Sequence, residues 1–337
     1  MSDVGDNNFI RYIYRGAEGE RIPLEATHIF VHKDVSFVRA RAFRNHRNII
    51  EVICHVNVEM IEEEAFRNCP RLRRVIMPGV KIVEKMVFSW STSLTDVDCS
   101  NLEIIQELAF AACRSLRSIS LPSARIVESS AISNCHALVD AKFGRNLETI
   151  ERGTFYGCNS LERITIPLKN DVISANADNV FTLCEKLEHV DLVEAEVLQK
   201  TVAALQLEEW RNDMNEVIDS INRILPDARA GHYSDYDDDN YREVYTGKKA
   251  RVIRRWIRSV LRKVVRYKAK HQHVLDGAAT RLQLALPQDI VINSVLPFLR
   301  LPSYSFDGEE EYSAEVRIMK MKKAAELESN CCSCCIQ

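Results

Sequence analysis

The sequence predicts an α/β repeat solenoid followed by a C-terminal α-helical bundle. A unit of the form [I/V]xxxAFxxCxxLxx[V/I]xxP recurs seven times at steps of 22 to 26 residues, a period typical of solenoids. Its segment from leucine to proline alternates apolar and polar residues, as a strand does. The repeat stops near Glu194, and apolar residues then recur at helical spacing.

One position of the unit is aromatic in six of its seven copies: Phe43, Phe66, Phe88, Phe110, Ile132, Phe155 and Phe181. Within Leu116–Pro122, Ile119 and Leu121 point to one side of a strand, which the proline ends because it has no N–H to donate. The stretch Ile105–Cys113 places apolar groups at i, i+4, i+5 and i+8, which favours about two helical turns.

The segments on either side of the repeats complete the predicted organisation. The β-type runs Phe9–Tyr14 and Thr27–His32 are separated by glycine and proline, which favours a hairpin-like connection. We therefore expect residues 1–34 to form an N-terminal cap and residues 35–193 to form the seven-repeat solenoid. A helical domain over 194–308 then contains an acidic loop at 231–243 and a basic helix at 248–285. A helical or disordered tail, 309–337, carries a terminal cysteine cluster.

The repeat units resemble the BspA-like class of leucine-rich repeats. The copies Phe66/Cys69/Leu72, Phe110/Cys113/Leu116 and Phe155/Cys158/Leu161 match most closely. The resemblance implies a right-handed solenoid with a parallel sheet on one face, and a sheet face and edges that serve adhesion or protein binding. The sequence departs from the pattern at His46 and Ser91 in place of cysteine, at Ile132 in place of phenylalanine, and at the insertion 171–179.

Composition and motifs argue against an enzyme. The chain of 337 residues is 46% apolar and has a formal charge of −3, so no global attraction to nucleic acid is expected. It contains 11 glycines and neither GxGxxG nor GxxxxGK[ST], so no phosphate-binding loop is indicated. No nucleophile–base pair or paired-carboxylate motif stands out. We predict a non-enzymatic interaction protein without a cofactor.

The 11 cysteines are not read as a disulfide framework. Five of them occupy the same position of the repeat: Cys69, Cys113, Cys135, Cys158 and Cys184. A spacing of about 22 residues supplies no CxxC pair for zinc, so small core thiols explain them without a metal. The polar first residues lack the apolar core of a signal peptide, and no run of 18 apolar residues occurs. We expect reduced thiols in a cytoplasmic protein that is not secreted.

The exposed strand positions are the first candidate for partner binding. Because neighbouring strands lie about 4.8 Å apart, alternate residues of successive repeats form a nearly continuous strip. The alternatives are a protein-recognition face and a plain solvated surface. The positions are Glu51, Ile53, Arg74, Ile76, Asp96, Asp98, Ser118, Ser120, Asp140, Lys142, Arg163, Thr165, His189 and Asp191.

The basic helix is the second candidate. Residues 248–270 contain eleven lysines and arginines and no acid. Such a helix binds anionic lipid, acidic proteins or nucleic-acid phosphates, and we rank a membrane surface ahead of nucleic acid. Internal neutralisation by the acidic residues 235–239 is the other interpretation. The candidate residues are Arg251, Arg255, Arg258, Arg262 and Arg266.

Two short motifs lie near the C-terminus. Cys334–Gln337 resembles the CaaX tail of prenylated small GTPases, which implies a farnesyl group on Cys334 and acylation at Cys331 and Cys332. CxxC metal or redox chemistry and a tail without a role remain alternatives. Leu286–Val291 with Leu296–Leu299 resembles the opening of an F-box, which implies a ubiquitin-ligase substrate receptor. A plain bundle helix capped by Asp289 is the alternative.

Overall fold

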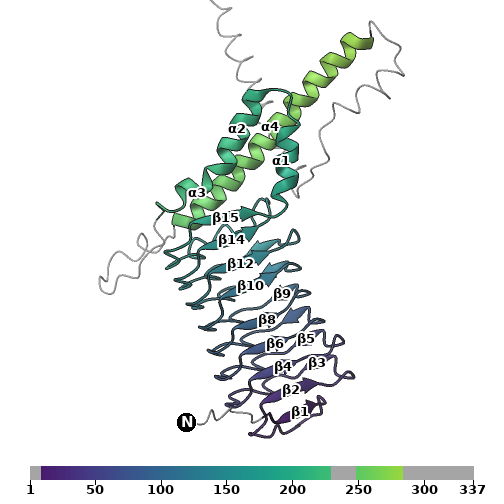
Figure 1. The fold of residues 1–337 in the computed structure, drawn as a ribbon, viewed down its shortest axis with the longest axis vertical. Helices are drawn as coiled ribbons and strands as arrows, with labels where there is room; N and C mark the ends of the chain where they lie inside the picture. The colour runs from purple at the N-terminus through teal and green to yellow at the C-terminus, as the bar shows by residue number, and fades with distance from the viewer. Residues whose placement is uncertain (1–8, 229–247, 284–337) are drawn as a thin grey trace, which may run out of the picture. The chain divides into compact units, whose positions relative to one another are not determined.

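A computed structural model describes residues 9–228 and 248–283 of the chain, with side chains as far as residue 278 (Figure 1). The described residues fall into two compact units. Unit 1 holds the chain up to Pro167, then Asp171–Glu194 and Ser220–Arg255. Unit 2 holds Leu168–Asn170, Ala195–Asp219 and the described chain from Trp256 onward.

Unit 1 is a stack of coils held by three parallel sheets. The first has the order β1 (Arg11–Tyr14), β2 (His28–Val31), β4 (Glu51–Ile53), β6 (Arg74–Ile76), β8 (Asp96–Asp98). The second has the order β10 (Ser118–Leu121), β12 (Asp140–Phe143), β14 (Arg163–Ile166), β15 (His189–Leu192). The third has the order β13 (Thr149–Ile150), β11 (Ile126–Val127), β9 (Ile104–Ile105), β7 (Ile82–Val83), β5 (Met60–Ile61), β3 (Phe37–Val38). The predicted parallel solenoid is confirmed, and Figure 1 shows its strands stacked in chain order.

The predicted hairpin-like connection near the N-terminus is wrong. β1 and β2 pair in parallel, with Arg11 opposite His28 and Tyr14 opposite Val31. The chain therefore makes a complete coil between them, and β1 is the first strand of the same sheet. Glycine and proline in the connection serve the turns of this coil, where Gly16 and Gly19 adopt positive φ angles of 71° and 70°.

The prediction of about two turns of helix in each repeat is also wrong. These segments form non-helical turns instead. Within one coil, two residues four positions apart adopt left-handed φ angles, and this pair recurs in successive coils. Examples are Glu64 (56°) with Asn68 (57°) and Leu108 (58°) with Ala112 (59°). This conformation directs main-chain groups to the neighbouring coil. The N–H of Phe66 accordingly donates to Val87 O at 3.0 Å, not to a carbonyl of its own segment. The coil-to-coil bonds satisfy the buried backbone in place of a helix.

The core is built by equivalent residues of successive coils. The rings of Phe43, Phe66 and Phe88 are stacked with centroids 4.8 and 5.5 Å apart, and the stack continues to Phe110 at 5.2 Å. Ile132 interrupts it, and Phe155 with Phe181 resume it. These side chains are almost fully buried, so each coil depends on its neighbours to remove its apolar surface from water.

The last coil of unit 1 is joined by helical segments. α3 (Ile221–Ile224) contributes Asn222, whose side-chain oxygen accepts the N–H of Val190 at 3.0 Å. The first turns of α4 (Lys248–Gln283) bring the buried ammonium of Lys249 to the carbonyl oxygens of Glu185 and Leu187. Main-chain acceptors of the last coil are thus satisfied by a cation from a distant part of the chain.

Unit 2 contains α1 (Ala195–Ala203), α2 (Glu208–Asp219) and most of α4. The stretch 202–225, in which apolar residues recur at helical spacing, contains parts of three helices, α1, α2 and α3. Trp256 donates its indole N–H to Val217 O at 2.8 Å, and the ring of Tyr267 stacks on Trp210 with centroids 5.6 Å apart. The Asp213 carboxylate accepts hydrogen bonds from Lys263 and Tyr267. Aromatic packing and one polar cluster therefore join α2 to α4.

Candidate functional site

The outward residues of the two strand-face sheets form two columns. Parallel register places Glu51 opposite Arg74 and Arg74 opposite Asp96 in one column, with Ile53, Ile76 and Asp98 in the other. In the second sheet the first column is Ser118, Asp140, Arg163 and His189, and the other is Ser120, Lys142, Thr165 and Asp191. The predicted face residues thus lie on one side of the strands, exposed or half-buried, while Val75, Ile119 and Ile164 point inward.

The strip is not continuous, because the sheet is interrupted between β8 and β10. In the preceding coils the residue after the strand donates its N–H to the next coil, as Cys54 does to Ile76 O at 2.8 Å and Met77 to Asp98 O at 3.0 Å. At the break, the thiol of Cys99 faces Ser120 O at 3.6 Å. At this position a thiol, which is a weak hydrogen-bond donor, therefore takes the place of the main-chain N–H that joins the preceding coils.

Charged residues of the face are paired with one another. Arg74 lies 3.0 Å from the Asp96 carboxylate and 3.6 Å from that of Glu51. Further along, Lys142 pairs with Asp140 at 3.0 Å and Arg163 with Asp191 at 2.6 Å. The hydrogen bond and charge of Asp191 raise the pKa of the Arg163 guanidinium. The face is polar here, but most of its charge is internally neutralised.

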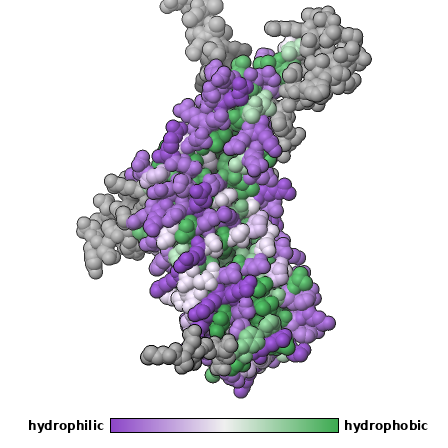
Figure 2. Space-filling model, viewed as in Figure 1, coloured by the Kyte–Doolittle hydropathy of each residue, from purple (hydrophilic) through white to green (hydrophobic). Residues whose placement is uncertain are grey.

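An apolar column occupies the first four strands of the face. Register places Ile13, Phe30, Ile53 and Ile76 side by side on β1, β2, β4 and β6; we call these four residues the apolar column. Ile13 is 38% exposed, and Figure 2 shows hydrophobic residues gathered over these strands at the lower end of the view. The guanidinium of Arg11 lies 4.3 Å from the centre of the Phe30 ring. An aligned apolar row on an outward sheet face is a candidate contact surface.

Sequence reasoning found only half of the apolar column. Ile53 and Ile76 were expected on the face, whereas Ile13 and Phe30 were assigned to the cap. The alternation of Arg11–Tyr14 was the available signal, since Ile13 stands two residues from Arg11 on the same side of the strand.

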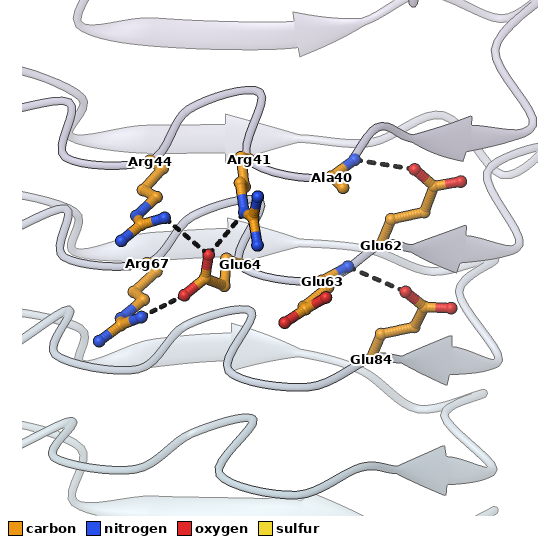
Figure 3. A network of polar contacts seen from close by, with 8 residues as sticks. All are labelled: Ala40, Arg41, Arg44, Glu62, Glu63, Glu64, Arg67 and Glu84. Carbon is orange, nitrogen blue, oxygen red and sulfur yellow. Dashed lines mark hydrogen bonds and ion pairs between the residues drawn. The ribbon is translucent and has the colours of Figure 1, made fainter.

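The turn segments carry a second cluster, which sequence reasoning missed (Figure 3). The carboxylate of Glu64 is 5% exposed and pairs with Arg41 at 2.7 Å, with Arg44 at 2.8 Å and with Arg67. Burial alone would raise the pKa of Glu64, but hydrogen bonds from Arg67 and Arg41 and the charge of Arg44 hold that pKa below its usual range. Residues 20 to 23 positions apart meet here only because the coils stack.

The arginines expected to form an anionic-partner site have unequal surroundings. Arg251 pairs with Asp178 of the insertion at 2.8 Å, and Arg254 pairs with the same carboxylate, so the two arginines share one counter-charge within unit 1. Arg258 is half-buried on α4, and the other four arginines are exposed: Arg251, Arg255, Arg262 and Arg266. The acidic residues 235–239, the F-box-like segment and Cys331, Cys332 and Cys334 lie outside the described residues.

Metal chemistry and membrane spanning find no support in the described ranges. Among residues 9–228 and 248–278, no group of three His, Cys, Asp or Glu side chains is placed to hold a metal ion. No helix in the described part of the chain is long and apolar enough to cross a bilayer. The seven described cysteines are free and buried.

Comparisons with known proteins agree with this architecture. The family model described as "BspA type Leucine rich repeat region" matches in six copies over residues 24–138 and 103–202. A leucine-rich repeat protein from Bacteroides ovatus is 24% identical over 51% of this chain and 47% of its own length, with a TM-score of 0.42. The leucine-rich repeat protein of T. pallidum is 20% identical over 55% of this chain and 70% of its own, with a TM-score of 0.34.

The pneumococcal vaccine antigen PcpA is 13% identical over 51% of this chain and 42% of its own, with a TM-score of 0.33. This chain thus spans about half the length of the Bacteroides ovatus protein. No match was found among curated proteins. The family match covers more than half of the chain, from residue 24 to residue 202, and follows the coils of unit 1. The chain belongs to the BspA-type leucine-rich repeat family.

Proposed function

We propose that the chain is a non-enzymatic scaffold that binds a protein partner along its strand face. The observation that carries this proposal is the apolar column, in which Ile13 is exposed and Phe30, Ile53 and Ile76 are half-buried on an otherwise polar sheet surface. Nothing in the fold requires these side chains to be apolar, since Asp98, Ser120 and Lys142 hold the equivalent position in later strands. A partner that covers the column would remove it from water.

The neighbouring ion pairs favour the same site. Arg74 already pairs with the carboxylates of Glu51 and Asp96, so a partner does not have to supply a counter-charge for this arginine in order to bind beside the column. Burial of apolar surface contributes about 25 cal/mol per Å², and a few central side chains usually supply most of the binding energy. We therefore place the centre of the interface at Ile53, with the polar strands β10 to β15 at its periphery.

Photo-crosslinking tests this assignment. A benzophenone amino acid placed at Ile53 is expected to crosslink a reproducible set of proteins in cells, and the set should be absent when the same group replaces Arg117 outside the face. Binding of the captured proteins, once purified, should fall at least tenfold with the double variant Ile53→Asp, Ile76→Asp. The matched control Ser118→Asp, Ser120→Asp adds the same charge to the second sheet and should leave affinity within about threefold. Equal loss in both variants would contradict an interface centred on the column.

The C-terminal tail carries a separate proposal about localisation. We propose that Cys334 is prenylated, that Cys331 or Cys332 is acylated, and that the chain is thereby held on the cytoplasmic side of a membrane. The support is the Cys334–Gln337 sequence, and the exposed Arg255, Arg262 and Arg266 of α4 would favour an anionic lipid surface. Fractionation of the full chain against Cys334→Ser in a eukaryotic cell decides it: the wild type should pellet with membranes and the variant should not.

The alternative function is an F-box-like ubiquitin-ligase receptor. It rests on the segment 286–299 alone. Co-purification of a ligase adaptor that is lost with Leu296→Asp would favour it over a plain scaffold.

A further inference from the structure

The Arg41, Arg44, Arg67 and Glu64 cluster is built around a carboxylate that the fold does not require. Glu64 occupies a repeat position with left-handed φ, and Met86, Leu108 and Ser130 hold the same position in later coils with φ angles of 56°, 58° and 57°. A neutral side chain therefore suits this turn. Burying a carboxylate at the same place adds a desolvation cost, which is offset only by the three guanidinium groups.

The cluster leaves positive charge and hydrogen-bond donors unused. Three guanidinium groups around one carboxylate carry a net charge of about +2. A guanidinium has five N–H donors, and the described contacts use one from each arginine on Glu64. The side chains of Arg41, Arg44 and Arg67 are 59%, 37% and 32% exposed, so the other donors are accessible to a ligand.

The nearby acids Glu62, Glu63 and Glu84, all within the described residues, form no ion pair with these arginines. The carboxylates of Glu62 and Glu84 accept main-chain N–H groups of Ala40 and Glu63 at 2.8 and 2.9 Å. Figure 3 shows both displaced along the coils from Arg44 and Arg67, with Glu63 between the two groups. The stretches that supply Arg41, Arg44 and Arg67 are free of acids: residues 39–48 and 65–75 contain no Asp or Glu. Arg47 and Arg71 from these stretches are also exposed.

We propose that Arg41, Arg44 and Arg67, held in place by Glu64, form a binding site for a phosphate dianion. A phosphomonoester carries about −1.5 to −2 charges at neutral pH and three acceptor oxygens, which match the net charge and the spare donors of the cluster. Arginine binds such groups through pairs of parallel N–H bonds, and a guanidinium already fixed by a carboxylate loses less side-chain entropy on binding. The source of the phosphate is a phosphorylated side chain of a protein or a free phosphate anion.

This proposal does not depend on the strand-face function, because the cluster lies in the turn segments and is tested with small probes. The full chain, labelled with ¹⁵N in its arginine side chains, is titrated with inorganic phosphate, with a phosphoserine peptide and with the same peptide carrying serine. Sodium chloride keeps the ionic strength constant. We expect saturable shifts of a small set of Nε–Hε signals with the first two probes and none with the third. Tighter binding of the phosphopeptide would identify a phosphorylated protein as the ligand. Tighter binding of inorganic phosphate would identify the free anion as the ligand.

Variants separate a built site from general electrostatics. The double variant Arg44→Gln, Arg67→Gln should lower the affinity at least tenfold, while Arg117→Gln and Arg73→Gln together remove the same charge from exposed arginines outside the cluster and should change it less than twofold. If the first variant unfolds, Arg44→Lys with Arg67→Lys keeps the charge but not the planar fork, and a loss of at least threefold is expected. The proposed site would be contradicted if the shifts did not saturate or were spread over all exposed arginines. It would also be contradicted if the cluster and control variants lowered the affinity equally.

Discussion

The thiol of Cys69 donates a hydrogen bond to the carbonyl oxygen of Phe43 in the preceding coil, with Sγ and O 3.1 Å apart. The same bond recurs from Cys113 to Phe88 O at 3.3 Å and from Cys135 to Phe110 O at 3.2 Å. Where the repeat departs from cysteine, the replacement is again a polar side chain beside the same kind of acceptor. Ser91 Oγ donates to Phe66 O at 2.9 Å, and His46 Nε2 lies 3.0 Å from Pro23 O. The position therefore selects a buried hydrogen-bond donor and not a thiol as such.

Replacement of Cys69 tests this rule. Cys69→Ser keeps a donor and should cost less stability than Cys69→Ala, because the alanine variant leaves Phe43 O with only the N–H of His46 as a partner. We expect the alanine variant to be less stable than the serine variant by about 1 kcal/mol, the usual net value of one hydrogen bond. Urea unfolding of both variants measures the difference. Equal stability would show that the thiol acts through volume alone.

The reactivity of the repeat thiols is a second prediction. Burial raises the pKa of the Cys69, Cys99 and Cys184 thiols to about 12, so almost no thiolate is present at neutral pH. A variant with serine at Cys331, Cys332, Cys334 and Cys335 should therefore not react with Ellman's reagent in its native state at pH 8. In urea it should release seven equivalents, one for each buried cysteine. Fast reaction before unfolding would contradict the buried ladder.

The parallel strands of the repeats could be predicted from sequence because their signal is local and repeated. The turns could not. The apolar spacing of Ile105, Ala109 and Phe110 fits a helix, but it fits equally a coil whose side chains all point inward. The backbone bonds that decide between the two run to another coil, as from Phe110 N–H to Ala131 O at 2.7 Å. Non-glycine residues with left-handed φ, such as Leu108, give no sequence signal at all.

The candidate sites show the same limit. The outward positions of the predicted strands were assigned correctly to one face by alternation, whereas Ile13 and Phe30 joined them only through the parallel pairing of β1 with β2. The Glu64 cluster joins residues of two coils, and its contacts depend on coil register. Local patterns reveal which side chains point outward. They do not reveal which of them meet.

Glycine provides a third test, at the close approach of two coils. A Cβ atom at Gly144 would lie 1.8 Å from Pro122 O, so the backbone would have to move. We expect Gly144→Ala to destabilise unit 1 by about 1–3 kcal/mol, as overpacking usually does. Gly277 is the matched control: it lies exposed in α4, a Cβ atom there would meet nothing within 4 Å, and Gly277→Ala should stabilise the helix by up to about 1 kcal/mol. Thermal unfolding with opposite shifts for the two variants is the expected result.

The pH dependence of stability tests the ion cluster. The neighbouring arginines hold the pKa of Glu64 below its usual range in the folded chain. A carboxyl group whose folded pKa is lowered stabilises the fold fully above its unfolded pKa of about 4.3, and this contribution is lost as the pH falls through the folded value. The free energy of unfolding of the wild type should therefore exceed that of Glu64→Gln at pH 6, and the difference should shrink as the pH is lowered toward 3.

Two controls make the interpretation specific. Glu148 forms an exposed ion pair with Arg125 at 2.8 Å, and Glu148→Gln should change stability by less than about 1 kcal/mol at pH 6. Arg41→Gln removes one of the three cations that lower the pKa of Glu64, so its effect should have the same sign as that of Glu64→Gln and should be smaller. A constant difference between wild type and Glu64→Gln from pH 6 to pH 3 would mean that folding does not shift the pKa of Glu64. A difference that moves in favour of the wild type as the pH falls from 6 would mean that Glu64 is protonated in the folded chain. In that case the cluster would carry a full charge of +3, and the charge argument for a dianion at the phosphate site would have to be revised.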